Sequence, residues 1–129
     1  MGRALQILTL TDIVEINRRM IAEFGGVFFE GNLNLGNRGS LEHVLEEIRG
    51  PIFGHDPHPT VIQKASAVRW RIIANHVFID GNKRAGMEAC RLMLDLNGYA
   101  MRIDREVVDM ALRIATHGVE FTDFVLWIQ

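Results

Sequence analysis

Two helical patterns and the turn between them occupy residues 60–97, which read TVIQKASAVRWRIIANHVFIDGNKRAGMEACRLMLDLN. Thr60, followed three residues later by Gln63, forms a capping-box pattern and predicts a helix start. The apolar residues after Thr60 recur at helical spacing, and continuing the same count places His76 on the buried face at the end of this helix. A second helix is predicted over residues 82–97. It is apolar around most of its circumference, which is typical of a central helix.

The rest of the chain is predicted to add helices around this pair. Thr9 or Thr11 is available to cap the first of them, and Ser40 to cap the second. The loops between are rich in Gly, Asn and Pro, and one short extended piece leaves room for a small hairpin or strand. The expected fold class is all-α, a compact bundle of about six helices around a central buried helix. The further helices are predicted over residues 9–24, 40–48, 104–117 and 122–128.

Size and composition restrict the domain count, partners and location. A chain of 129 residues with 48% hydrophobic content can bury one core, so residues 1–129 are expected to form a single domain. The 14 basic and 16 acidic residues are mixed along the chain without a basic stripe, which argues against nucleic acid as a partner. One cysteine, Cys90, allows no intramolecular disulfide. Without a signal sequence or a membrane-length apolar segment, a cytoplasmic protein with no membrane partner is expected.

The start of the second helix has the features of an anion site. The first turn of a helix presents unpaired N–H groups and the positive end of the helix dipole, which together can hold a phosphate. Gly81 allows the backbone to approach such an anion closely, and Asn82, Lys83 and Arg84 add donors beside it. Lys83 and Arg84 could instead be a solvated helix start, but positive charge there opposes the dipole and favours a bound anion.

Two further residues of the turn suggest chemistry on that anion. His76 has an imidazole suited to taking a proton from a hydroxyl, although a lone histidine on an apolar face is more commonly a satisfied core residue. Asp80 supplies the hard oxygen ligand that magnesium takes when it is also bound by phosphates. A base, a metal ligand and a phosphate clamp therefore fall within nine residues, and this density favours function over the structural interpretation.

Two other features are interpreted as structural. The run at residues 55–58, His-Asp-Pro-His, has the composition of a metal site, but it lacks a third clear ligand and is predicted to be an exposed loop. Cys90 lies in the apolar sector of the second helix and is expected to be a small buried hydrophobe.

The run His-Val-Phe-Ile-Asp-Gly-Asn-Lys-Arg at residues 76–84 resembles the core motif of the Fic/Doc family, specifically its Doc-like, death-on-curing toxins. In that family a His-any-Phe-any-Asp-Gly-Asn segment precedes a central helix. The resemblance covers nearly the whole chain. It extends to Leu8-Thr9, Phe24-Gly25-Gly26, Ser40-Leu41-Glu42, Lys64-Ala65 and Leu96-Asn97-Gly98-Tyr99.

The resemblance implies a role for each matching residue. ATP would be the substrate, Mg²⁺ the metal, and a protein hydroxyl the acceptor. By this resemblance His76 would be the general base, Phe78 would anchor the loop in the core, Asp80 would help hold Mg²⁺, Gly81 and Asn82 would contribute to the anion cradle, and Arg84 would bind nucleotide phosphate.

Lys83 bears on which part of ATP is transferred. AMP-transferring Fic proteins have a second glycine at this place, whereas the Doc branch has lysine, binds ATP in a reversed orientation and passes the γ-phosphate to a translation elongation factor. Met87 points the same way, since the AMP-transferring pattern has arginine there. Gly81, where some Doc members have alanine, is Fic-like, and Val77 replaces a frequent proline. AMP or other nucleotidyl transfer, and a catalytically inactive protein-binding module, remain as alternatives.

Inhibition is expected from a separate protein. Fic enzymes often carry an inhibitory helix with Ser or Thr, then Glu four residues later, then Gly or Asn. Thr11 and Glu15 have this spacing, but Ile16 follows them. The resemblance to Doc-like toxins implies instead a small antitoxin protein whose disordered C-terminal segment folds onto the toxin as a helix.

Overall fold

The computed structural model describes residues 5–51, 53–99 and 113–114. This part of the chain contains four α-helices and no strand, and Leu35 and Phe78 form an isolated bridge, so the all-α prediction is confirmed there. The two helices predicted nearer the C-terminus lie outside the described residues, except for residues 113 and 114, which are helical. The elements are α1 (Leu10–Phe24), the 3₁₀ helix η1 (Glu30–Asn32), α2 (Arg38–Glu47), α3 (Val61–Ala74) and α4 (Asn82–Leu96).

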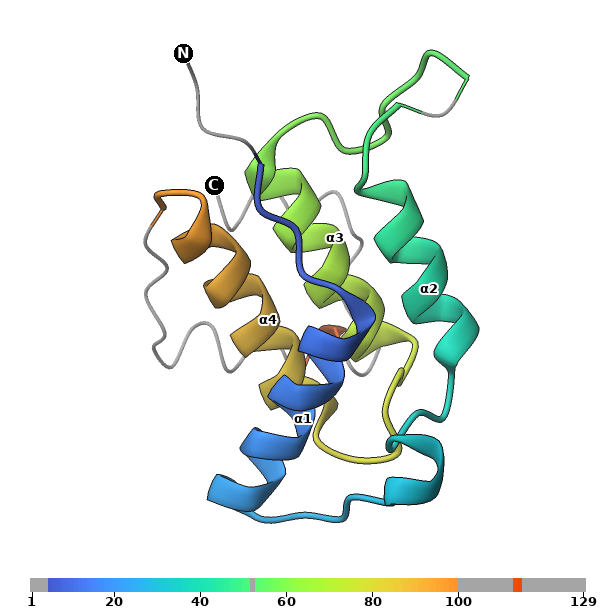
Figure 1. Cartoon of the computed structure of the whole chain (residues 1–129), viewed down its shortest axis with the longest axis vertical. Helices are drawn as coiled ribbons and strands as arrows, with labels where there is room; N and C mark the ends of the chain where they lie inside the picture. Colours follow the sequence, from blue (N-terminus) through green and yellow to red (C-terminus); the bar gives the residue numbers. More distant parts are fainter. Residues whose placement is uncertain (1–4, 52, 100–112, 115–129) are drawn as a thin grey trace.

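The helices pack around α3 and α4, which run side by side. α3 lies between α2 and α4, while α1 packs against α4 and α2 (Figure 1). Nine of the 14 residues of α3 are buried, against six of the 15 in α4, so among the described residues α3 shares the central place that was predicted for α4. The core between the helices includes the fully buried residues Ile13, Ile16, Leu41, Val44, Val68, Ile72, Phe78 and Met93.

The helix starts follow local capping chemistry. Thr9 caps α1 and Thr60 caps α3, each in a reciprocal capping box, as the sequence predicts. The prediction of Ser40 as the cap of α2 is wrong. The side chain of Asn37 accepts from the backbone N–H of Ser40 at 3.3 Å, and the helix begins at Arg38. Asparagine caps as well as serine does, and here it comes first along the chain.

α3 and α4 approach closely just beyond the loop that joins them. A Cβ added at Gly86 would lie 2.8 Å from Cγ1 of Ile73, so only glycine fits this contact without movement of its neighbour. Further along α4, Cys90 is buried as predicted. Burial raises the pKa of its thiol to about 11, despite the opposing influence of Arg69. The close contact holds the start of α4 against the end of α3, where the loop of interest lies.

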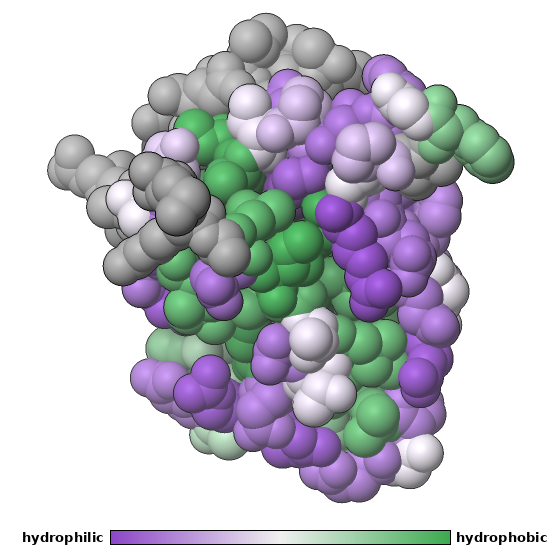
Figure 2. All heavy atoms as spheres, turned by 45° about the horizontal axis from the view of Figure 1, so that its top comes forward, coloured by the Kyte–Doolittle hydropathy of each residue, from purple (hydrophilic) through white to green (hydrophobic). Residues whose placement is uncertain are grey.

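The surface is mixed, with apolar atoms gathered in the middle of one face and hydrophilic residues at its edges (Figure 2). Among the described residues, no helix combines the length and the hydrophobicity needed to cross a membrane.

Candidate functional site

The loop between α3 and α4 does not continue the helix before it. α3 ends at Ala74, and His76 has φ +47°, in the left-handed region. The prediction that His76 lies on the buried face is therefore wrong, and its side chain is exposed. The helical count fails because the helix stops two residues earlier. Val77 and Phe78 point into the core instead, with 0% and 1% of their surface exposed.

Asn82 fastens the loop to the start of α4. Its side-chain Nδ2 donates to the carbonyl of Phe78 at 2.7 Å, and its Oδ1 accepts from the N–H of Phe78 at 2.8 Å. Gly81 precedes it in the left-handed conformation, with φ +80°. The Asn82 side chain is committed to Phe78 through its Oδ1 and one amide hydrogen, and its backbone N–H, one of the first-turn donors without an intrahelical acceptor, can be offered to an anion.

Asp80 is held by two backbone donors. Gly81 N–H donates to its Oδ1 and Val27 N–H to its Oδ2, both at 2.9 Å. Gly26 permits this approach, because a Cβ at Gly26 would lie 2.7 Å from Asp80 Oδ2. Each carboxylate oxygen keeps a free lone pair after one such bond. The described residues contain no group of three or more His, Cys, Asp or Glu arranged to hold a metal ion, and Asp80 fits Mg²⁺ as a single protein ligand that works together with phosphate oxygens and water.

Two buried asparagines support the loop from outside the motif. Asn17 of α1 donates through Nδ2 to the backbone carbonyl of Asp80 at 2.9 Å, and Asn34 donates to Asn17 Oδ1 at 2.9 Å. Both have 0% exposed surface, and the carbonyl of Asn34 accepts from Ile79 N–H at 2.8 Å. Sequence reasoning missed them. The available signal was a polar Asn17 on the apolar face of a helix, four residues after Ile13.

Replacing Asn17 with alanine is expected to lower the free energy of unfolding by about 2 kcal/mol, because it removes the bonds of Asn17 to the Asn34 amide and the Asp80 carbonyl and leaves those two groups only the longer bond between them, at 3.4 Å. Urea denaturation measures this. Asn75→Ala is the matched control, since it removes one exposed side-chain bond, to Ser40 at 2.9 Å. A loss for Asn17→Ala no larger than for the control would contradict the supporting role.

The predicted site residues come together around one pocket of about 410 Å³. Phe78 is the exception, as it lies beneath the loop in the core. Lys83 and Arg84 are exposed at the first turn of α4, whose free N–H groups add positive charge to the cavity. Phe24, Gly25, Ile73 and Ile79 complete the wall. The residues of the motif that line the pocket are His76, Asp80, Gly81, Asn82, Lys83 and Arg84.

A family model described as the Fic/DOC family matches residues 7–94, which contain all of these site residues. The chain belongs to the Fic/DOC family. It is also similar to a curated protein named Toxin Doc from Mycolicibacterium smegmatis, with 28% identity over 108 residues, covering 81% of this chain and 83% of that protein. The Fic/DOC match includes the whole loop between α3 and α4 on which the pocket is built.

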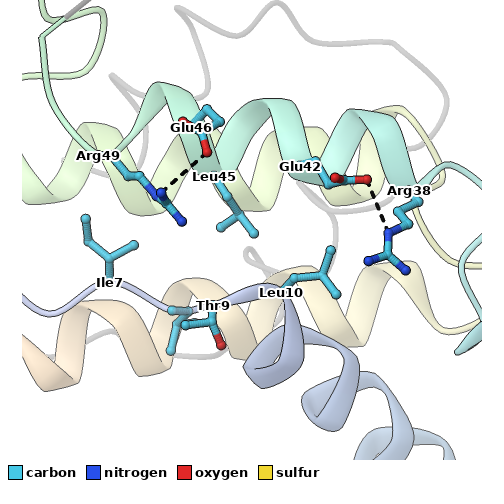
Figure 3. A pocket seen from close by; sticks show the side chains of 9 residues that line it. Ile7, Thr9, Leu10, Arg38, Glu42, Leu45, Glu46 and Arg49 are labelled. Atoms are coloured by element: carbon cyan, nitrogen blue, oxygen red, sulfur yellow. Dashed lines mark hydrogen bonds and ion pairs between the residues drawn. The ribbon is translucent and has the colours of Figure 1, made fainter.

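A second hollow of about 440 Å³ lies between residues 7–10 and α2, away from the Fic/DOC motif (Figure 3). Ile7, Leu10 and Leu45 form its apolar part. Its rim carries the ion pairs Arg38–Glu42 at 3.2 Å and Arg49–Glu46 at 3.4 Å. It contains none of the predicted site residues, and each of its cations is already paired with a carboxylate.

The loop at residues 55–58 is more firmly held than the sequence suggests. Asp56 pairs with the buried Lys64 at 3.5 Å, and His58 Nε2 lies 3.1 Å from Glu47 Oε2. Burial by itself raises the pKa of the Glu47 carboxyl, but hydrogen bonds from Arg71 and His58 outweigh it and leave that pKa lowered. The prediction of an exposed loop is correct for His55 and wrong for His58, whose side chain is 12% exposed.

Proposed function

We propose that this protein is a Doc-like toxin that transfers the γ-phosphate of ATP to a hydroxyl side chain of a protein, with a translation elongation factor as the target. One observation carries the proposal: His76, Asp80 and the cationic start of α4 line a single pocket of about 410 Å³. Within it, a base, a metal-binding oxygen and a phosphate clamp can act on one triphosphate.

Each group would make a distinct contribution. The first-turn N–H groups of α4, with Lys83 and Arg84, would bind the phosphates and balance their charge. His76 would take the proton from the target hydroxyl as its oxygen attacks the γ-phosphorus, the bond to the β-phosphate oxygen breaks, and ADP leaves. Asp80 would hold Mg²⁺, which, when bound, neutralises charge on the phosphate oxygens. Catalysis would then depend mainly on positioning and electrostatics.

Two residues favour γ-phosphate transfer over AMP transfer. Lys83 stands where AMP-transferring relatives have a second glycine, and Met87 stands where they have an arginine. Gly81 favours AMP transfer instead, because it is shared with the AMP-transferring pattern. AMP transfer by the same loop is therefore the second candidate, and a catalytically inactive binding module is the third.

ATP labelled at either the α- or the γ-phosphate distinguishes these functions. Incubated with the protein and a bacterial extract, γ-labelled ATP is expected to label an extract protein of elongation-factor size, and α-labelled ATP is expected to label none. The reason is that the proposed reaction keeps the α-phosphate on the ADP that leaves. Label arriving only from the α-position would establish nucleotidyl transfer instead. Label from neither position, together with no binding of Mg-ATP by calorimetry, would favour the binding module.

We further propose that a separate antitoxin holds the protein inactive. The name of the similar protein, Toxin Doc, supports this. The partner would be a small protein whose disordered C-terminal segment folds on binding. A toxin acting on an elongation factor would work in the cytoplasm.

A further inference from the structure

We infer that Asn17 and Asn34 are positioning residues, which set the affinity of the site for Mg²⁺ through a closed path of hydrogen bonds to Asp80; this rests on the proposed function. Both asparagines are fully buried and lie outside the motif at residues 76–84. Asp80 is half-buried, and among the described residues it is the one carboxylate that lines the phosphate pocket. The orientation of this single side chain therefore decides where a metal ion can bind.

The path holds the main chain of Asp80 at one end. Asn17 Nδ2 donates to the carbonyl oxygen of Asp80 at 2.9 Å, and Asn34 Nδ2 lies 3.4 Å from the same oxygen. Asn34 Nδ2 also donates to Asn17 Oδ1 at 2.9 Å, which fixes the orientation of the Asn17 amide. A Cβ added at Gly81 would lie 2.8 Å from Asn17 Nδ2, so this amide is in close contact with the loop. The peptide unit between Asp80 and Gly81 is thus held from the side of α1.

The path holds the carboxylate of Asp80 at the other end. Val27 N–H donates to Asp80 Oδ2 at 2.9 Å. Asn34 holds the segment that carries Val27, because its Oδ1 accepts from Phe29 N–H at 3.1 Å and its own N–H donates to the Phe29 carbonyl at 2.9 Å. The hydrogen bonds therefore leave Asp80 at its carbonyl, pass through Asn17, Asn34 and the 27–29 segment, and return to its carboxylate. A side chain held at both ends keeps little rotational freedom.

This fixation matters because Asp80 would be a single protein ligand for Mg²⁺. Hydrogen-bond partners that orient a metal ligand typically contribute about 10–100-fold to metal affinity or activity. The phosphate contacts depend less on the path, because the first-turn N–H groups of α4, Lys83 and Arg84 provide them. Loss of the Asn17 amide should therefore weaken the contribution of Mg²⁺ more than it weakens the binding of ATP itself.

The test measures the Kd for ATP by calorimetry, once with MgCl₂ and once with EDTA. The ratio of the Kd in EDTA to the Kd in MgCl₂ reports the contribution of Mg²⁺. Asn17→Ala is expected to lower this ratio about tenfold, toward the ratio of Asp80→Asn. Its Kd in EDTA is expected to change less than about twofold, because the phosphate contacts remain. Asn75→Ala is the matched control and is expected to keep the wild-type ratio.

The rate of γ-label transfer as a function of MgCl₂ concentration gives a second readout. Asn17→Ala is expected to need about tenfold more MgCl₂ for its half-maximal rate, while saturating MgCl₂ restores the rate to within about threefold of wild type. A change that only lowered stability would reduce the amount of folded protein and leave the MgCl₂ dependence of the remainder unchanged.

Val27→Pro and Val27→Ala break the same path without touching the core, since Val27 is 48% exposed. Proline removes the backbone N–H that donates to Asp80 Oδ2, and alanine keeps it. Val27→Pro is expected to lower the ratio about tenfold, and Val27→Ala to keep it. If Asn17→Ala does not fold, this pair decides, and equal ratios for the two variants would overturn the inference.

The possible results separate this inference from the proposed function. If the wild-type chain binds ATP under neither condition, the proposed function fails and the inference fails with it. If Mg²⁺ tightens binding to the wild-type chain and Asn17→Ala keeps the wild-type ratio, the asparagines are only structural and the proposed function stands. Equal weakening of ATP binding with MgCl₂ and with EDTA would show a general distortion of the pocket, and would also overturn the inference.

Discussion

Replacing His76 is expected to slow phosphate transfer by about 10²–10⁴-fold, the usual contribution of a general base, while the protein stays folded. His76 is exposed and sits after the end of α3, so its side chain makes no part of the core. The informative change is His76→Asn, because asparagine tolerates the left-handed φ of +47° far better than alanine does. Transfer of γ-label is the measurement.

His76→Ala is the second variant, and thermal unfolding followed by circular dichroism reports on both. A folded His76→Asn protein that transfers phosphate at the wild-type rate would rule out His76 as the base. If only His76→Ala loses activity, the residue matters for the backbone conformation of the loop and not for proton transfer.

Asp80→Ala is expected to lower the rate of transfer by at least about 100-fold and to abolish its response to magnesium. The carboxylate is the one metal-binding oxygen pair that the described residues bring into the pocket, and removing a half-buried, hydrogen-bonded charge of this kind costs about 3 kcal/mol of transition-state stabilisation. The measurement is the initial rate as a function of MgCl₂ concentration.

Two controls accompany Asp80→Ala. Asp80→Asn keeps an acceptor oxygen for one of the two backbone donors, Val27 and Gly81, but removes the charge. If it recovers thermal stability without recovering activity, the charge itself is required. Asp95→Ala removes an exposed carboxylate from the far end of α4 and is expected to have no effect. A variant at Asp80 that keeps both the normal rate and its magnesium dependence would contradict the metal role.

Features set by neighbouring residues could be predicted from sequence. The capping boxes at Thr9 and Thr60 and the start of α4 at Asn82 depend on hydrogen bonds within one helical turn, and all three are where they were predicted. The approach of His76, Asp80 and Arg84 to one cavity followed from the short loop that joins two adjacent helices.

Other features depend on distant parts of the chain. His76 was assigned to the buried face because helical periodicity does not show where a helix ends, and here the burial of Phe78 takes the chain off the helical path. The hydrogen bond between Asn17 and Asn34 joins residues that are 17 positions apart in the sequence, and the bond between Asn17 and Asp80 joins residues that are 63 positions apart. No local pattern specifies such pairs, because their partners lie on segments that are distant in the sequence and meet where α1 packs against α4.

Because the loop depends on Asn17 and Asn34, the motif by itself is not sufficient to build the site in another protein. The nine residues 76–84, grafted between two helices of an unrelated scaffold, would lack the amide that holds the Asp80 carbonyl and the Val27 N–H that orients its carboxylate. The transplanted segment would keep its sequence but not its conformation. For the same reason, a compound or peptide that separates α1 from α4 would remove the hydrogen bonds that hold Asp80. It would inactivate the site without contacting any residue of the motif.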